Sequence, residues 1–237
     1  SEDAQEIMIN DIEDDINVLP IRVCQAFAKS AQLYGASIFE YTKVFRIQKQ
    51  QDTFRIETTN GLVEAKRVVI ASGAWSTPFF QQLGLEQEMT PVKGECIAVE
   101  GGNALLKHTI FHDKYYIVPR NNGELVIGAT MKENDWSQQV SLDGMETLIH
   151  KAKELLPTIG HMKMTAAWSG LRPQTFDQKP FIGHHPEDDA ILFATGHYRN
   201  GILLAPATGE MIASLMLKRD VKKQWVDAFR VDRPLRR

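Results

Sequence analysis

The chain has 237 residues, of which 43% are hydrophobic and 24% are charged, and its formal net charge is −3. This composition is ordinary for a globular protein and excludes collagen-like, disulfide-scaffold and intrinsically disordered chains. The near-neutral charge argues against a nucleic-acid-binding surface. No apolar run approaches the roughly 18 residues that span a bilayer, and the polar first residues do not have the pattern of a signal peptide.

The two cysteines, Cys24 and Cys96, are too far apart in the sequence to suggest a disulfide framework. Such sparse cysteine usage is typical of a reducing compartment. We therefore expect a cytoplasmic protein with neither a nucleic-acid nor a membrane partner. The sequence does not begin with methionine, so a processed or truncated product is also considered.

A hairpin and then a helix are predicted at the start of the chain. Residues 8–18 alternate polar and apolar side chains, which is typical of a hairpin. A helical pattern begins after Pro20 and stops at Gly35. Its buried face is predicted to consist of Cys24, Phe27, Ala28 and Ala31. Cys24 is therefore interpreted as a small core residue and not as a nucleophile.

Several short elements follow before residue 91. An antiparallel meander is predicted with strands at 37–48, 53–58 and 62–65. Residues 67–71 are apolar on both faces, as in a buried strand of a parallel sheet. A tight turn at 72–76 then leads into a short helix, 77–83, which closes at Gly84.

From residue 91 the pattern changes to longer antiparallel strands. These strands are predicted at 95–99, 115–118, 124–130 and 162–168, and the second and third are joined by the four-residue loop 120–123. Asp143 and Glu146 have the spacing of a capping box, and the helix that they begin ends at Pro157. The apolar face of that helix is predicted to be Met145, Leu148, Ile149, Ala152, Leu155 and Leu156. A loop rich in proline and glycine follows Trp168.

The last part of the chain returns to an α/β pattern. A short buried strand is predicted at 190–194, a turn at 196–201 and a helix at 205–218, with Pro206 in the first helical turn. The fold class is therefore mixed α/β, with α/β pieces at both ends and a largely antiparallel block at 91–168. Two regions distant in sequence must then join one layer.

Three stretches carry candidate chemistry. Ser72-Gly73 follows a buried strand, and its small residues let a ligand come close. The polar loop Gly196–Gly201 leads into the amino end of a helix, where negative charge is favoured. Arg172, within Gly170–Pro173, can hold a carboxylate through two parallel hydrogen bonds. Each stretch also has a plainer interpretation: a tight turn, a solvated loop and a surface ion pair, respectively.

Three further side chains, those of Tyr115, Tyr116 and Met131, are ambiguous. Tyr115 and Tyr116 lie on opposite faces of one strand, so one of them faces the interior, where its hydroxyl needs a structural partner or a bound carboxylate. Met131 fills the core unless a pocket lies there. No metal-ligand spacing, P-loop, G-x-S-x-G, CxxC or G-x-G-x-x-G motif occurs in the sequence.

Together and in this order, the segments resemble the D-amino-acid-oxidase-like family of FAD-dependent amine oxidases. The nearest resemblance is to its bacterial members that oxidise glycine in thiamine (thiazole) biosynthesis. It rests on Pro91–Cys96, Tyr116–Arg120, Val126–Met131, Gly170–Pro173 and Gly196–Gly209. It implies FAD-dependent oxidation of glycine and similar small amines by hydride transfer to the flavin. The imine would give glyoxylate and ammonia, and O2 would give hydrogen peroxide.

The resemblance also implies the roles of individual residues. Arg172 would pair with the substrate carboxylate, Tyr116 would hydrogen-bond the same group, and Arg199 and Met131 would line the site. The residues implied to contact FAD are Val44 through its backbone at the adenine end, Ser72, Gly73, His197, Tyr198, Arg199, Asn200, Gly201, Ile202 and Leu203. Members of this family are commonly tetramers, so a homo-oligomer is expected.

A partial FAD-binding Rossmann-like domain, interwoven with an antiparallel-sheet substrate domain, is the architecture that the resemblance implies. The substrate domain would comprise the hairpin at 1–17 and residues 91–168. The FAD-binding domain would comprise 18–90 and 169–218, and 219–237 would be a carboxyl-terminal tail.

The glycine-rich turn that holds the FAD pyrophosphate in the family is missing from this sequence, as is the acidic residue that holds the ribose. We therefore expect a fragment, about the carboxyl-terminal two thirds of a family member, that binds FAD weakly or not at all by itself. The alternatives are an oxidase of sarcosine or a small D-amino acid, or a module without catalytic activity of its own.

Overall fold

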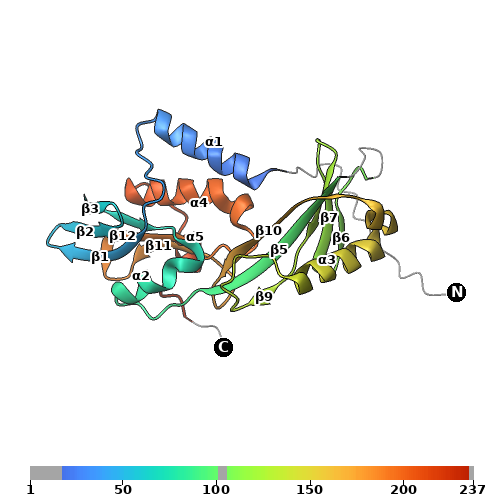
Figure 1. Ribbon diagram of the computed structural model, residues 1–237. Coiled ribbons are helices and arrows are strands. Elements are labelled where there is room, and N and C mark those ends of the chain that lie inside the picture. The colour runs from blue at the N-terminus through green and yellow to red at the C-terminus, as the bar shows by residue number, and fades with distance from the viewer. Residues whose placement is uncertain (1–17, 101–105, 235–237) are drawn as a thin grey trace. The chain divides into compact units, whose positions relative to one another are not determined.

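The computed structural model describes residues 18–100 and 106–234 (Figure 1). The hairpin predicted at 8–18 therefore lies almost entirely outside the described residues. The described residues form two compact units that are interleaved along the chain. Unit 1 holds Val18 and Val92–Leu171, and unit 2 holds Leu19–Pro91 and the residues from Arg172 onward. Within these described ranges, no helix is long and apolar enough to cross a membrane.

The first sheet of unit 2 is the predicted meander. Its strands are β1 (Val44–Gln50), β2 (Thr53–Thr58) and β3 (Gly61–Ala65), in the order β1-β2-β3 with antiparallel pairing. The type and order of the strands are confirmed, although β1 begins seven residues later than the apolar pattern predicted. The side chains of Phe54 and Ile47 pack from this sheet into the core of unit 2.

The second sheet of unit 2 joins the two ends of the α/β pattern. Its strands are β11 (Phe181–His185), β12 (Asp188–Thr195) and β4 (Val68–Ile70), in the order β11-β12-β4. β12 pairs with β4 in parallel, with Phe193 opposite Ile70. The prediction that two distant regions join one layer is thereby confirmed. β11 was not predicted.

The two faces of this second sheet are covered by different helices. Phe193 packs on one face against Phe80 of α2 (Thr77–Gln82), with ring centroids 5.3 Å apart. Leu192 faces the opposite way and packs with Met211 and Ile212 of α4 (Gly201–Met216). This alternation is that of a strand buried on both faces, as the sequence predicted.

Two predictions about the helices of unit 2 are wrong in part. α1 (Pro20–Leu33) forms where expected, but it buries none of its residues, and Cys24 and Phe27 are exposed. Periodicity defines the apolar face of a helix, but only a neighbouring element can bury that face, and none of those described does so. α4 begins at Gly201, so Pro206 lies inside the helix and not in its first turn. A further helix, α5 (Lys223–Phe229), occupies part of the expected tail.

Unit 1 is built on a six-stranded antiparallel sheet. The strand order is β10 (Met164–Gln174), β5 (Thr90–Glu100), β8 (Glu124–Gly128), β7 (Tyr115–Pro119) and β6 (Ile110–His112), with β9 (Lys132–Glu133) paired to β5. The predicted hairpin at 120–123 is confirmed by the bond from the Arg120 amide to the Glu124 carbonyl, 2.8 Å. Gly170–Pro173 was expected in a loop but extends β10. Proline is tolerated there because β10 is an edge strand.

Helix α3 (Leu142–Leu155) packs its buried residues Leu148 and Ala152 on this sheet, as predicted. Its cap differs from the prediction. The Ser141 hydroxyl accepts the Gly144 amide at 3.1 Å, so Asp143 lies in the first turn and is not the cap. Ile149, which was expected on the apolar face, is 40% exposed. The short helix η2 (Pro157–His161) follows.

Candidate functional site

Two of the candidate stretches leave the same edge of the second sheet of unit 2. Ser72-Gly73 follows β4, and Gly196 follows β12, its parallel neighbour. Ligands of open α/β sheets bind beyond the carboxyl ends of such strands. The sheet therefore places these two turns where a ligand site is expected.

A chain of hydroxyl groups fixes the first turn to the end of β12. Ser76, at the end of helix η1 (Gly73–Ser76), is fully buried, and its Oγ donates to the Gly73 carbonyl at 2.8 Å. The same Oγ lies 3.0 Å from Ser72 Oγ and 2.9 Å from Thr195 Oγ1. The backbone around Gly73 is thus held by Ser76 of η1, whose hydroxyl is in turn bonded to Thr195 at the end of β12.

The turn after β12 has room for glycine only. Gly196 has φ +80°, a conformation that other residues rarely adopt. A Cβ at this position would lie 2.5 Å from Thr175 Cγ2 and 3.0 Å from Met89 Cε. The loop from Gly196 onward is consequently packed tightly on the segment that follows β10.

The end of β10 is the third stretch that reaches this place. The Tyr198 amide donates to the Pro173 carbonyl at 3.0 Å, and Gln174 forms an antiparallel bridge with His197. A Cβ on Gly73 would lie 4.0 Å from Pro173 Cγ. The structure therefore brings the backbone of the segment beginning at Arg172 together with both turns, all within unit 2.

His197 does not lie in a solvated loop. Its Nε2 is 2.8 Å from Thr208 Oγ1 on α4, and burial lowers the pKa of the imidazole below its ordinary value of 6.5. The ring is therefore neutral at neutral pH. Because its polar edge is held by α4, His197 fixes the shape of the loop and adds no charge to it.

The amino end of α4 retains hydrogen-bonding capacity. Asn200 precedes the helix and makes no side-chain bond to the first turn, and Leu203 in that turn is 80% exposed. Arg199 is also exposed. Among the described residues, Gln174 Oε1 is a buried oxygen without a hydrogen-bond partner. An uncapped helix start and an unpaired buried acceptor on adjoining segments are features that a bound polar ligand would satisfy.

Tyr116 lies in unit 1, on the face of β7 opposite to the core. Tyr115 is only 9% exposed and packs in the core, which resolves the ambiguity between the two tyrosines. Tyr116 stands opposite Gly128 of β8, where a Cβ would lie 2.5 Å from the tyrosine ring. Its hydroxyl is 3.7 Å from Cys96 Sγ.

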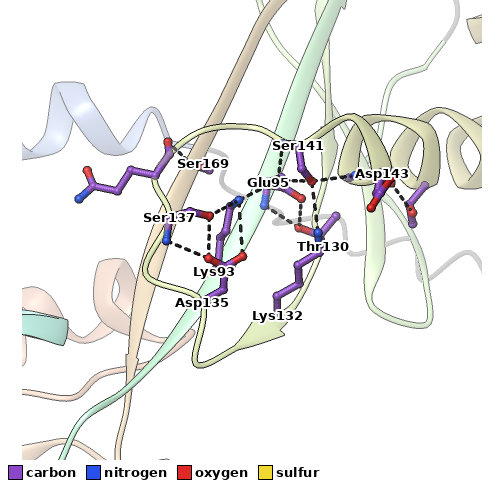
Figure 2. Close-up of polar contacts among 12 residues, drawn as sticks. Lys93, Glu95, Thr130, Lys132, Asp135, Ser137, Ser141, Asp143 and Ser169 are labelled. Carbon is purple, nitrogen blue, oxygen red and sulfur yellow. Dashed lines mark hydrogen bonds and ion pairs between the residues drawn. The ribbon is translucent and has the colours of Figure 1, made fainter.

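Met131 is partly buried, and it follows Thr130, which belongs to a buried polar network that the sequence did not predict (Figure 2). Lys93 and Glu95 are 2% and 0% exposed, and their charged groups are 3.1 Å apart. Glu95 also accepts the Thr130 hydroxyl at 3.0 Å and the Ser141 amide at 2.8 Å. The network thus fastens the residue before Met131 and the start of α3 to β5.

The pKa of Glu95 reflects this network. Burial alone would raise it, but hydrogen bonds from Ser141, Lys93 and Thr130 outweigh burial and lower it to about 2. One sequence signal was present: Lys93 and Glu95 are two residues apart in a strand and so share a face.

The remaining candidate residues are distributed as follows. Val44 begins β1, in a different sheet from β4 and β12. Tyr116 and Met131 belong to unit 1, whereas Arg172 and Arg199 belong to unit 2, so an approach between these two pairs stays a prediction. No cluster of three or more potential metal ligands occurs in the part of the chain that the structure describes.

Comparison with known proteins identifies the family. Residues 12–215 match the family described as FAD dependent oxidoreductase. The chain belongs to this family. It is 52% identical over 224 residues to a glycine oxidase of Bacillus licheniformis, covering 94% of this chain and 61% of that relative. It is 35% identical to a bifunctional ThiO/ThiG protein of Synechocystis, covering 88% of this chain and 32% of that protein.

Solved structures agree with the family assignment. The crystal structure of glycine oxidase from Geobacillus kaustophilus is 40% identical, with a TM-score of 0.86, over 90% of this chain and 58% of that one. The mixed α/β fold with an antiparallel sheet is therefore that of FAD dependent oxidoreductases. The chain spans about 60% of the length of the glycine oxidases of Bacillus licheniformis and Bacillus subtilis that it matches.

Proposed function

We propose that this chain is part of an FAD-dependent amine oxidase that acts on glycine and similar small amines. The overall reaction converts glycine, O2 and water into glyoxylate, ammonia and hydrogen peroxide. The observation that carries the proposal is the junction of the end of β10 with the 196–201 loop, in a chain half identical to a glycine oxidase. That junction joins the candidate carboxylate-binding arginine to the candidate cofactor loop.

The described residues fit one side of a flavin. Gln174 Oε1 is buried and unpaired, which suits an N–H donor of a ligand, and the start of α4 lacks a side-chain cap. We propose that residues 197–203 and the Ser72-Gly73 turn hold the isoalloxazine ring, with Val44 nearer the adenine. The pyrophosphate site is not supplied here, because no G-x-G-x-x-G motif occurs in these residues.

Substrate binding is assigned to two charged and two uncharged groups. Arg172 would hold the carboxylate of glycine through its two parallel N–H groups, which sets orientation as well as charge. Tyr116 would donate a hydrogen bond to the same carboxylate, and Arg199 and Met131 would line the site. A fixed carboxylate presents the Cα–H bond in one direction, and such positioning is a recognised source of rate.

The electrostatics of the loop favour negative charge on the ligand side. The positive end of the α4 dipole lies at residues 200–203, whereas the imidazole of His197 is neutral at neutral pH. The helix, and not the histidine, therefore stabilises an anionic edge of the ligand. FAD, when bound, supplies the two-electron oxidation, and the protein residues bind and orient.

Purification and steady-state kinetics of the complete gene product test the proposal. We expect a yellow protein with flavin absorbance and a higher kcat/KM for glycine than for sarcosine or D-alanine. Strong preference for a bulkier substrate would reassign the enzyme within its class, and absence of flavin would reject the proposal.

We further propose a cytoplasmic homo-oligomer in thiamine biosynthesis. Thiamine dependence of a strain that lacks the gene, together with light scattering of the protein, checks that assignment.

A further inference from the structure

The carboxyl-terminal segment contains an arginine that behaves as a core residue. Arg233 is only 8% exposed, although it lies beyond residue 215, where the family match ends. Its guanidinium carbon stands 4.3 Å from the centroid of the Phe181 ring and 5.1 Å from that of Phe176. Val231, two residues earlier, is part of the core of unit 2. An arginine is buried in this way only when its charge and its donors are satisfied.

The partners of Arg233 all lie on the loop between β10 and β11 or on its own segment. Nε donates to Asp177 Oδ2 at 3.0 Å and Nη2 to Asp177 Oδ1 at 2.6 Å, a two-pronged ion pair. Nη2 also donates to the Lys179 carbonyl at 2.7 Å, and Nη1 to the Pro180 carbonyl at 3.1 Å. The guanidinium thus binds one carboxylate and two backbone carbonyls of the 175–180 loop through one rigid group.

The loop that Arg233 holds is the one that touches the candidate site. Thr175 Oγ1 donates to the Lys179 carbonyl at 2.7 Å and lies 3.2 Å from Asp177 Oδ1. The methyl group of Thr175 in turn fills the space beside Gly196. Immediately before Thr175 come Gln174 and Pro173, which bond the backbone of residues 197 and 198.

We propose that Arg233 is a positioning residue for the candidate site. By fixing the 175–180 loop, it holds the end of β10, and with it Arg172, against the loop that begins at Gly196. The consequence for catalysis rests on the proposed function, whereas the effect on the backbone does not. Arg233 itself contacts neither substrate nor cofactor.

Conservative substitutions separate positioning from bulk stability. Arg233→Lys keeps the charge but loses the planar two-pronged geometry, and Asp177→Asn weakens the same pair from the other side. Arg230→Lys is the matched control, because Arg230 is a half-exposed arginine on the same segment that pairs with Asp232. All three are made in the complete gene product.

Two readouts are measured on these variants. The first is hydrogen exchange of the Tyr198 amide, with β2 amides as the reference. We expect exchange at Tyr198 to be about tenfold faster in Arg233→Lys and Asp177→Asn, with β2 unchanged. The second is steady-state kinetics, where we expect KM for glycine to rise about tenfold and kcat to change by less than about threefold, because a displaced Arg172 binds the carboxylate less well.

The outcomes are distinguishable. Unchanged exchange at Tyr198 in both variants overturns the proposal, as does an equal loss of protection in β2, which would make Arg233 a purely structural residue. If Arg233→Lys does not fold, Asp177→Asn decides in the same way. If the unsubstituted protein does not oxidise glycine, the proposed function fails, while the exchange readout still tests the positioning role of Arg233.

Discussion

The methyl group of Thr175 occupies the space that a side chain on Gly196 would need, 2.5 Å from the position of its Cβ. Gly196 also has φ +80°. A substitution at this position therefore meets two separate obstacles, one in the backbone and one in packing. The contact between Thr175 and Gly196 therefore fixes how closely the 196–201 loop packs on the segment that follows β10.

We expect Gly196→Ala to destabilise unit 2 by about 2–5 kcal/mol, the sum of roughly 1–2 kcal/mol for the backbone conformation and roughly 1–3 kcal/mol for overpacking. Gly35→Ala is the matched control, since Gly35 has φ +93° but no atom within 4 Å of its Cβ position. Thermal or urea unfolding of both variants measures the difference. Equal destabilisation by the two substitutions would contradict the steric role of Thr175.

Arg172→Ala is expected to lower kcat/KM for glycine, mostly by raising KM, because the carboxylate of the substrate loses its charged partner. The decrease corresponds to a loss of about 2–5 kcal/mol of transition-state binding. Arg172→Lys should recover only part of this, since lysine lacks the planar fork. Arg22→Ala, on the exposed helix α1, serves as the control. Kinetics identical to those of the unsubstituted enzyme would remove Arg172 from the site.

Lys93→Met is expected to cost about 3–5 kcal/mol of stability, because it leaves the Glu95 carboxylate buried without its cation. Lys151→Met is the comparison, since it breaks the surface pair with Glu154 and should cost at most about 1 kcal/mol. The free energy of unfolding in urea, measured at neutral pH, gives both values. A loss of under about 1 kcal/mol for Lys93→Met would show that the buried pair is dispensable.

The Glu95 network predicts a stability change in acid. The pKa of Glu95 is about 2 in the folded chain, below its ordinary value of 4.5. Its contribution, on the order of 3 kcal/mol, is therefore fully present above pH 4.5 and is lost as the pH falls toward 2. Glu95→Gln should flatten this part of the curve of unfolding free energy against pH. An identical curve for the variant and the unsubstituted chain would refute the assignment.

His197 predicts a second change, at milder pH. Its pKa is lowered from 6.5 by burial, so protonation favours the unfolded chain. The contribution to stability is complete above pH 6.5 and declines as the pH falls through the lowered value. NMR titration of the imidazole, assigned by comparison with His197→Gln, measures the midpoint. A midpoint at or above 6.5 would be incompatible with the buried geometry against Thr208.

The sequence predicted most of the secondary structure because local periodicity carries that information. The meander, the strands at 68–70 and 188–195 and the helices α1, α2 and α3 follow from apolar spacing and from turn residues. The predicted cap of α3 and the predicted burial of α1 were wrong, because both depend on contacts that local periodicity does not specify. Ser141, and not Asp143, caps α3, because its hydroxyl bonds both Gly144 and the buried Glu95.

By itself, the sequence determined the fold class, the family resemblance and the three stretches that carry the candidate chemistry, since these are properties of residue type and local order. Only the tertiary structure decided that Thr175, Gly196 and Arg233 belong to one packed unit, and that the side chain of His197 points to α4. Such contacts join residues distant in the chain, and packing at close range depends on three-dimensional geometry that no local pattern encodes.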